Sequence, residues 1–235
     1  MKVLNKDELK VAEGVLFKHL PKSYKVYGFL YGINRNKPST LEVVVDSWPD
    51  FKVIICRPDP KVKLALQLRK KVSCFSTDAQ VLKELFTEEN VLDWSTDFTV
   101  GGLNKSNEST LMEVSSIRQV SIRPFTLVHL LYLADSSHLL TPTVGSELES
   151  RISSLNLSHV DLVNKTWKFG GTEQEHRGKG YAKILVSTMA KRLHDEGHPV
   201  YCFIEEESVV SYRLFKNLGF TEDPSYRAQW FDINI

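Results

Sequence analysis

Several features that would narrow the function are missing from this sequence. Its 235 residues include three cysteines, Cys56, Cys74 and Cys202, and none of them belongs to a C-x-x-C pair. Neither a disulfide framework nor a metal site is therefore expected, and free thiols suit a reducing compartment. Basic and acidic residues nearly cancel to a net charge of +1, which gives no argument for nucleic-acid binding.

Long apolar runs are missing too. The most apolar run, residues 125–134, is far shorter than the roughly 20 residues that a membrane span needs. We interpret it as a buried strand, with His129 as a packed core histidine rather than a ligand. The first residues mix lysines with acids and contain no arginine, so we expect no transit peptide there. Residues 4–20 instead predict an amphipathic helix that ends before Pro21.

What is present describes an ordinary globular protein. Hydrophobic residues make up 42% and charged residues 25% of the chain, and the length allows two small domains. Residues 141–157 are rich in serine and contain Pro142 and Gly145, which is typical of a linker. We therefore predict an N-terminal domain over residues 1–140 and a C-terminal domain over residues 158–235.

The N-terminal half predicts both strands and helices. Strand-like runs cover residues 25–31, 41–45 and 51–56 and suggest an antiparallel meander after the first helix. Short helices are predicted over residues 79–87 and 107–117. Trp48 and Trp94 are expected in the core. The predicted fold class is α/β, or α+β with a mixed sheet.

One stretch carries most of the chemical information. Residues 172–183 read TEQEHRGKGYAK and run into a helical pattern. Gly178 and Gly180 let the backbone approach a ligand closely, and Arg177 and Lys179 add positive charge. A helix that starts here directs its free N–H groups and its positive dipole end to the same point. The stretch therefore predicts an anion-binding site.

The elements after this loop follow a regular order. Apolar residues from Tyr181 to Leu193 are predicted to share one helix face, and Gly197 and Pro199 end the helix. Residues 200–204 predict a short buried strand, and residues 211–220 a helix that ends in Gly-Phe. The loop lacks the lysine-serine/threonine end of the Walker pattern and the third glycine of the dinucleotide fingerprint.

The loop pattern R-x-x-G-x-A resembles the pyrophosphate loop of the GNAT superfamily of acetyl- and acyltransferases. The resemblance implies acyl-CoA as co-substrate, with no metal. Its implied binding residues are Arg177, Gly178, Lys179, Gly180, Tyr181 and Ala182. The alternative is a glycine turn among scattered charges.

Three further segments resemble the glycine N-acyltransferase family. They are residues 25–28 (KVYG), 45–51 (VDSWPDF) and 159–171 (HVDLVNKTWKFGG). The resemblance implies transfer of an acyl group from acyl-CoA to the amino group of glycine or a related amino acid. It also implies a mitochondrial location, with the cytoplasm as alternative. We expect a monomer whose partners are acyl-CoA and a small amino acid, without nucleic acid.

The chain departs from that family just before the loop. Residues 169–176 are polar where a strand should enter the loop, and a helix is predicted from Ser158. The family has a helix and three strands here, about 40–50 residues at ordinary lengths. The sequence therefore resembles the family with an internal block removed, which makes the C-terminal domain an incomplete GNAT-like one.

The expected carboxylate base belongs to that block, so the catalytic residues stay unassigned. Glu173, Glu175 and His176 flank the loop and would lie near phosphates, not near the thioester. His194 and His198 are expected at a helix end on the surface. Some GNAT enzymes use a tyrosine as acid where this chain has Phe215.

Two non-catalytic alternatives stay open. The chain could be an internally truncated acyl-CoA-binding protein with little or no turnover, or its N-terminal domain could be an interaction module.

Overall fold

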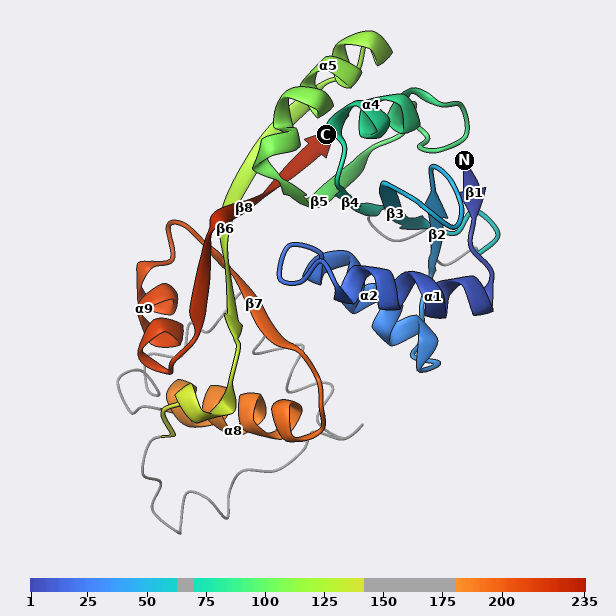
Figure 1. Cartoon of the computed structure of the whole chain (residues 1–235). Helices are drawn as coiled ribbons and strands as arrows, with labels where there is room; N and C mark the ends of the chain where they lie inside the picture. The colour runs from blue at the N-terminus through green and yellow to red at the C-terminus, as the bar shows by residue number, and fades with distance from the viewer. Residues whose placement is uncertain (63–69, 142–180) are drawn as a thin grey trace. The chain divides into compact units, whose positions relative to one another are not determined.

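The computed structural model of the chain describes residues 1–62, 70–141 and 181–235 (Figure 1). In these residues one sheet holds strands in the order β1-β2-β3-β4-β5-β8-β6-β7. The strands are β1 (Lys2–Val3), β2 (Leu41–Val45), β3 (Val53–Pro58), β4 (Lys71–Ser76), β5 (Phe98–Asn104), β6 (Ile122–Leu133), β7 (Val200–Glu205) and β8 (Thr221–Ile233). The α-helices are α1 (Lys6–Phe17), α2 (Tyr24–Asn34), α4 (Ala79–Thr87), α5 (Glu108–Arg118), α8 (Tyr181–Asp195) and α9 (Val209–Asn217).

The sheet is mixed, which confirms the predicted fold class. Strands β2, β3 and β4 are antiparallel neighbours, β4 and β5 are parallel, and β5 is antiparallel to β8. The register of β5 against β8 is interrupted between Val100 and Leu103. Gly101 and Gly102 occupy this bulge, and Gly102 has a φ of +73°, which favours glycine.

Backbone contacts divide the chain into two compact units. Among the described residues, unit 1 holds 1–62, 70–130, 203–208 and 222–235, and unit 2 holds 131–141, 181–202 and 209–221. The predicted division into domains 1–140 and 158–235 stays a prediction, because the predicted linker lies outside the described residues from position 142 on.

Unit 1 buries apolar side chains on both faces of its sheet. Alternation along β2 sends Val43 and Val45 to the face covered by α1 and α2, and Val44 to the face covered by α4 and α5. Trp94 is buried on the second face and donates its indole N–H to the Phe86 carbonyl at 3.1 Å, as its predicted core role requires. Trp48 is only half-buried and stacks on Phe51 at the edge of the core between the sheet and helices α1 and α2.

The strand predicted over residues 25–31 is wrong, because these residues form helix α2. Tyr24, Tyr27 and Leu30 recur every three residues, so one face of the helix packs into the core beneath α1. Aromatic and β-branched residues favour strands in isolation, but tertiary burial overrides that preference. The antiparallel meander does exist, displaced along the chain to β2, β3 and β4.

Several other predicted elements are confirmed. Helix α1 lies within residues 4–20, and Asn5 caps it by accepting N–H groups from Asp7 and Glu8. Helices α4 and α5 and strands β2, β3, β6 and β7 lie where the patterns placed them. Strands β4, β5 and β8 were not predicted. Residues 61–71 form a basic stretch in the sequence, and residues 63–69 of it lie outside the described residues.

Candidate functional site

The predicted coenzyme loop lies almost entirely outside the described residues. Arg177, Gly178, Lys179 and Gly180 belong to residues 142–180, as do the flanking Glu173, Glu175 and His176. Tyr181 and Ala182 are described, and they form the first turn of α8, with Tyr181 half-buried and Ala182 exposed. The loop therefore stays a prediction, while the helix predicted to follow it is confirmed.

Helix α8 turns a different face inward from the one predicted. Ile184, Ser187 and Ala190 are its buried residues, whereas Leu185 and Met189 are 56% and 55% exposed. Small side chains such as Ser187 and Ala190 let a helix pack closely. The apolar pattern, which gives weight to large residues, therefore predicted the wrong rotation of α8 about its axis. The end of the helix is as predicted: Gly197 has a φ of +76° after the last turn.

Helix α9 ends in the predicted Gly-Phe pair for a steric reason. Gly219 has a φ of +95°, and a Cβ there would lie 1.8 Å from the His138 carbonyl oxygen. The glycine is therefore required by packing within unit 2. Phe215 packs edge-on against Phe220, with ring centroids 5.0 Å apart, and has no proton to offer a leaving thiolate.

One histidine–carboxylate pair forms within unit 1. The Nδ1 atom of His129 on β6 lies 2.8 Å from Oε1 of Glu222 on β8, and the two side chains are 17% and 14% exposed. Nη1 of Arg227 lies 2.8 Å from the same carboxylate oxygen, and its Nε lies 3.5 Å from Oε1 of Glu206. A carboxylate that hydrogen-bonds to a ring nitrogen orients the imidazole. His129 is thus packed, as predicted, but in an ionic network.

His194 and His198 lie at the end of α8, as predicted. His198 lies 3.3 Å from the Glu196 carboxylate, and Arg192 donates to the same residue at 2.9 Å. The hydrogen bond from Arg192, with a smaller contribution from His198, lowers the pKa of Glu196. His194 is half-buried in the last turn of the helix.

The cysteines are unsuited to nucleophilic or metal chemistry. All three are free, and burial raises the pKa of Cys74 and of Cys202 to about 12, so both thiols stay protonated at neutral pH. Burial also raises the pKa of Cys56. The described residues contain no group of three or more His, Cys, Asp or Glu that could hold a metal ion, and no helix of theirs has the length and apolarity to cross a membrane.

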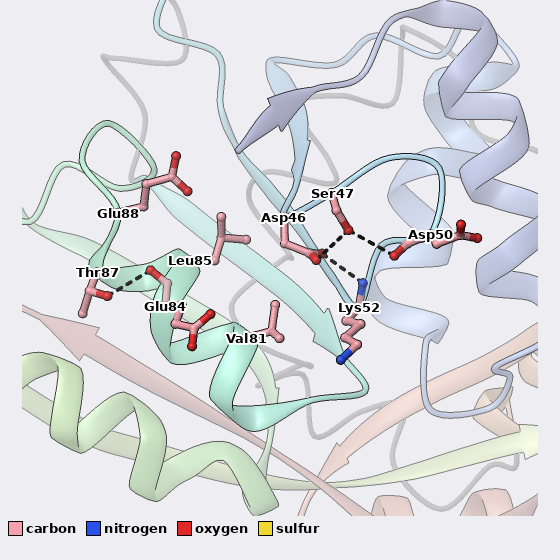
Figure 2. Close-up of a pocket in the computed structure, with 9 residues that line it drawn as sticks. All are labelled: Asp46, Ser47, Asp50, Lys52, Val81, Glu84, Leu85, Thr87 and Glu88. Atoms are coloured by element: carbon pink, nitrogen blue, oxygen red, sulfur yellow. Dashed lines mark hydrogen bonds between the residues drawn. The ribbon is translucent and has the colours of Figure 1, made fainter.

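A pocket of about 710 Å³ lies beside the VDSWPDF segment (Figure 2). We call it the acidic bay. It is lined by Asp46, Ser47, Asp50, Lys52, Val81, Glu84, Leu85, Thr87 and Glu88. Four carboxylates against one lysine repel phosphates, so the bay is a poor site for a coenzyme that carries them.

The side chains of that segment hold its own loop together. Oδ1 of Asp46 accepts the backbone N–H groups of Lys52 and Val53 at 2.9 and 2.7 Å. The Ser47 hydroxyl lies within hydrogen-bond distance of two acceptors, the Asp46 carboxylate and the Asp50 carbonyl (Figure 2). The Asp46 carboxylate therefore has a structural role in a tight turn.

Sequence reasoning did not identify Glu222 or Arg227. Both lie on β8, where alternation of buried Tyr226, Ala228 and Phe231 with other residues is irregular and Pro224 interrupts the pattern. Residues 129 and 222 are 93 positions apart, so no local signal connects them. Only the pairing of β6 with β8 brings them together.

Comparison with known proteins adds an independent line of argument. A family model described as aralkyl acyl-CoA:amino acid N-acyltransferase matches residues 1–189, and one described as FR47-like protein matches residues 171–230. Glycine N-acyltransferase of Rattus norvegicus is 28% identical over 286 residues, which cover 96% of this chain and 96% of the rat protein. The Mus musculus enzyme of the same name is 29% identical over 284 residues, with 94% and 95% covered.

A solved structure shares the fold. The X-ray structure of a Drosophila protein matches with a TM-score of 0.74 and 13% identity, over 100% of this chain and 99% of the other. The alignment with the rat enzyme runs over 286 positions and takes in 96% of the 235 residues here, about 226, so roughly sixty of its positions have no counterpart in this chain. The family match over residues 1–189 nevertheless covers well over half of the sequence, and this chain belongs to the aralkyl acyl-CoA:amino acid N-acyltransferase family.

Proposed function

We propose that this protein transfers an acyl group from acyl-CoA to the amino group of glycine or of a related small amino acid. The observation that carries the proposal is the alignment with glycine N-acyltransferases of rat and mouse along 94% or more of the chain. In this reaction the amine nitrogen attacks the thioester carbonyl, the C–S bond breaks and the coenzyme leaves as its thiol. Only the neutral amine attacks, so a base must accept a proton from the ammonium form.

The loop at residues 177–182 is the proposed coenzyme site. Arg177 and Lys179 would pair with the phosphates, and Gly178 and Gly180 would let the backbone approach them. Support comes from helix α8, whose first residue, Tyr181, belongs to the loop's sequence pattern, and a helix N-terminus favours anions. Holding the thioester beside the amine lowers the entropic cost of their encounter.

A change at Gly180 tests this site. Gly180→Glu adds bulk and negative charge where the backbone must meet phosphate, so we expect at least a tenfold loss of CoA affinity in calorimetry. Gly14→Glu is the matched control, because a Cβ at Gly14 on α1 meets nothing within 4 Å. Equal CoA affinities of the two variants would contradict the assignment of the loop.

A second candidate function rests on the length comparison. The alignment with the rat enzyme has roughly sixty positions without a counterpart here, a number similar to the length of the block that we expect to be missing before the loop. By family resemblance, that block would carry the base. In this alternative the chain binds acyl-CoA and turns it over slowly or not at all. Loss of an oxyanion donor costs about 10²–10³ in rate and loss of a base about 10²–10⁴, and the two need not multiply.

One experiment separates the two functions. Purified protein is incubated with benzoyl-CoA and glycine, while thiol release and N-benzoylglycine are measured. The control carries the corresponding segment of the rat enzyme between Gly171 and Thr172. Comparable rates would show that a residue of this chain serves as the base; a rate at least about 10²-fold lower, with CoA binding intact, would favour the truncated binding protein. Mitochondrial location stays a proposal from the family alone, to be checked by fractionation.

A further inference from the structure

Lys25, the first residue of the KVYG segment, lies in an unusual environment for a lysine. Its Nζ atom lies 5.4 Å from the ring centroid of Phe29, 5.9 Å from that of Phe203 and 5.5 Å from that of Trp230. We call these three rings the aromatic cage. Phe29 comes from α2, Phe203 from β7 and Trp230 from β8, and all belong to unit 1. Each ring lies within the distance at which a cation is attracted to an aromatic face.

The cage does not supply what an ammonium group needs most. Lys25 has three N–H donors, and in the described part of the chain it makes no hydrogen bond and no ion pair. The indole N–H of Trp230 likewise donates to no described acceptor. Aromatic faces attract the charge but accept hydrogen bonds poorly, so the cage holds a cation with its donors unused.

The charges around Lys25 favour an anion. Burial lowers the pKa of Lys25, and the nearby Lys71 lowers it further. The Cys56 thiol acts in the opposite direction, but burial raises its own pKa and keeps it neutral. No described carboxylate acts on Lys25. An incoming anion would therefore find uncompensated positive charge.

The backbone beneath the cage is shaped to admit these side chains. A Cβ on Gly101 would lie 3.0 Å from Nε1 of Trp230, and a Cβ on Gly102 would lie 3.0 Å from Cγ of Lys25. Both glycines lie in the bulge of β5, and bulges often re-aim side chains beside active sites. Lys25 and the three rings all keep partial exposure, so a ligand can reach them.

We infer that Lys25 and Trp230 bind the carboxylate of the amino acid that this protein acylates, and of the acylated product. The Lys25 ammonium and the Trp230 indole are two donor groups that match the two oxygens of a carboxylate, and the rings form apolar walls for a small organic acid. The inference rests on the proposed function for the identity of the ligand. A coenzyme phosphate is the other source of an anion, since Lys25 lies in the first turn of α2. A pyrophosphate is usually held by several charged donors, whereas Lys25 is the one cation among the side chains of the cage, so we favour the carboxylate.

A lysine at the carboxylate would also assist the chemistry. A positive charge near the acceptor's ammonium group favours loss of its proton, which increases the fraction of neutral amine. Lys25 would thus be a binding residue that also prepares the nucleophile.

Binding of the product tests the inference without turnover. N-benzoylglycine and N-benzoylglycinamide differ only in the carboxylate, and calorimetry measures their affinities for the wild-type protein. We expect the acid to bind about 10- to 100-fold more tightly than the amide, as for a charge-assisted pair. Equal affinities would overturn the inference.

Variants then locate the binding group. Lys25→Met should bind the acid as weakly as the amide, and Lys25→Arg should retain most of the affinity. Lys22→Met, at an exposed lysine three residues earlier and just before α2, should behave as the wild type. Unchanged affinity for the acid in Lys25→Met, or an equal loss in Lys22→Met, would refute the site. Circular dichroism checks the fold, and if Lys25→Met fails to fold, the acid–amide comparison on wild type and Lys25→Arg decides.

A last arm separates the carboxylate from a phosphate and from the proposed function. Adenosine 3′,5′-bisphosphate should bind Lys25→Met and wild type alike; a selective loss of this ligand would assign Lys25 to the coenzyme instead and overturn the inference. If benzoyl-CoA and glycine give no product while N-benzoylglycine still binds through Lys25, the proposed function fails and the inference stands.

Discussion

Lys52 in the acidic bay and Lys25 in the aromatic cage are lysines of the same unit in opposite surroundings. Nζ of Lys52 lies 3.0 Å from the Asp78 carboxylate on an exposed surface, and that hydrogen bond raises its pKa. Lys25 is half-buried against three rings, and burial lowers its pKa. Both lie in or next to segments that carry the family resemblance, yet in the described part of the chain only Lys52 has an acidic partner for its charge.

This difference in charge compensation indicates a structural role for the polar groups of the acidic bay and a functional role for Lys25. In the acidic bay, each polar group recorded around Asp46 completes a turn, so the protein gains stability from it. In the aromatic cage, a charged group is held where burial penalises it, and such positions are typical of sites that trade stability for function. The following predictions test this contrast, from the largest expected effect to the smallest.

The bulge under the aromatic cage should be sensitive to a single methyl group. Gly102→Ala combines a φ of +73° with a Cβ 3.0 Å from Cγ of Lys25, so we expect a loss of about 1–3 kcal/mol in the free energy of unfolding. Gly32→Ala on α2 is the control, since a Cβ there meets Lys37 at an ordinary 3.8 Å and should stabilise by about 0.5–1 kcal/mol. Chemical denaturation measures both; equal effects would show that the bulge is not strained by a side chain.

Removing the carboxylate from the acidic bay should destabilise without affecting ligand binding. Asp46→Ala leaves the N–H groups of Lys52 and Val53 without their acceptor, at a cost of about 1–2 kcal/mol. Asp46→Asn keeps one oxygen and should lose less. N-benzoylglycine affinity should stay at the wild-type value in both, and a loss in the folded variants would mean that the bay, not the cage, serves the substrate.

The pH dependence of stability should have opposite signs at the two lysines. A lowered pKa means that the folded state disfavours the charged form, so wild type should gain stability relative to Lys25→Met as pH rises through the lowered pKa toward 10.5. The raised pKa of Lys52 means that the folded state favours its charged form. The contribution of Lys52 is present below 10.5 and is lost only as pH rises through its raised value.

Urea unfolding at pH 7 and at pH 10 measures this contrast. Lys25→Met should unfold at the same or a higher urea concentration than wild type at pH 7, with that advantage reduced at pH 10. Lys52→Met should differ little from wild type at either pH, because the side chain is exposed and such pairs contribute little. A Lys25→Met variant that is clearly less stable at pH 7 would show that the cage stabilises the protein.

Much of the fold could be predicted from local patterns. Helices α4, α5 and α8 and strands β2 and β7 carry a period of their own, and glycine 197 marks an end that needs a positive φ. Helix α2 was mistaken for a strand, because its aromatic residues suit either state and only packing under α1 decides. Strands β5 and β8 depend on pairing with each other, which a local pattern does not reveal.

The coenzyme loop and the aromatic cage also differ in whether their residues are close together in the sequence. The coenzyme loop stays a prediction from its adjacent glycines and charges, because residues 177–180 lie outside the described residues. The aromatic cage was not predictable, since Phe29, Phe203 and Trp230 meet only after distant strands and a helix have assembled. A lysine followed four residues later by a phenylalanine, as Lys25 is by Phe29, is common in helices. Nothing in the sequence shows that two further rings lie beside the same lysine.

The position of β8 has a consequence for how the protein is made. This strand is the last of the described strands in sequence, yet it lies between β5 and β6 in the sheet. During synthesis, β5 and β6 leave the ribosome some hundred residues before their common neighbour. Until β8 is made, the edges of β5 and β6 that it will cover have unpaired backbone N–H and carbonyl groups. Such edges can pair with strands of other chains and aggregate. Final folding is therefore post-translational, and we expect the nascent protein to depend on chaperones that cover exposed strand edges until residue 233 has emerged.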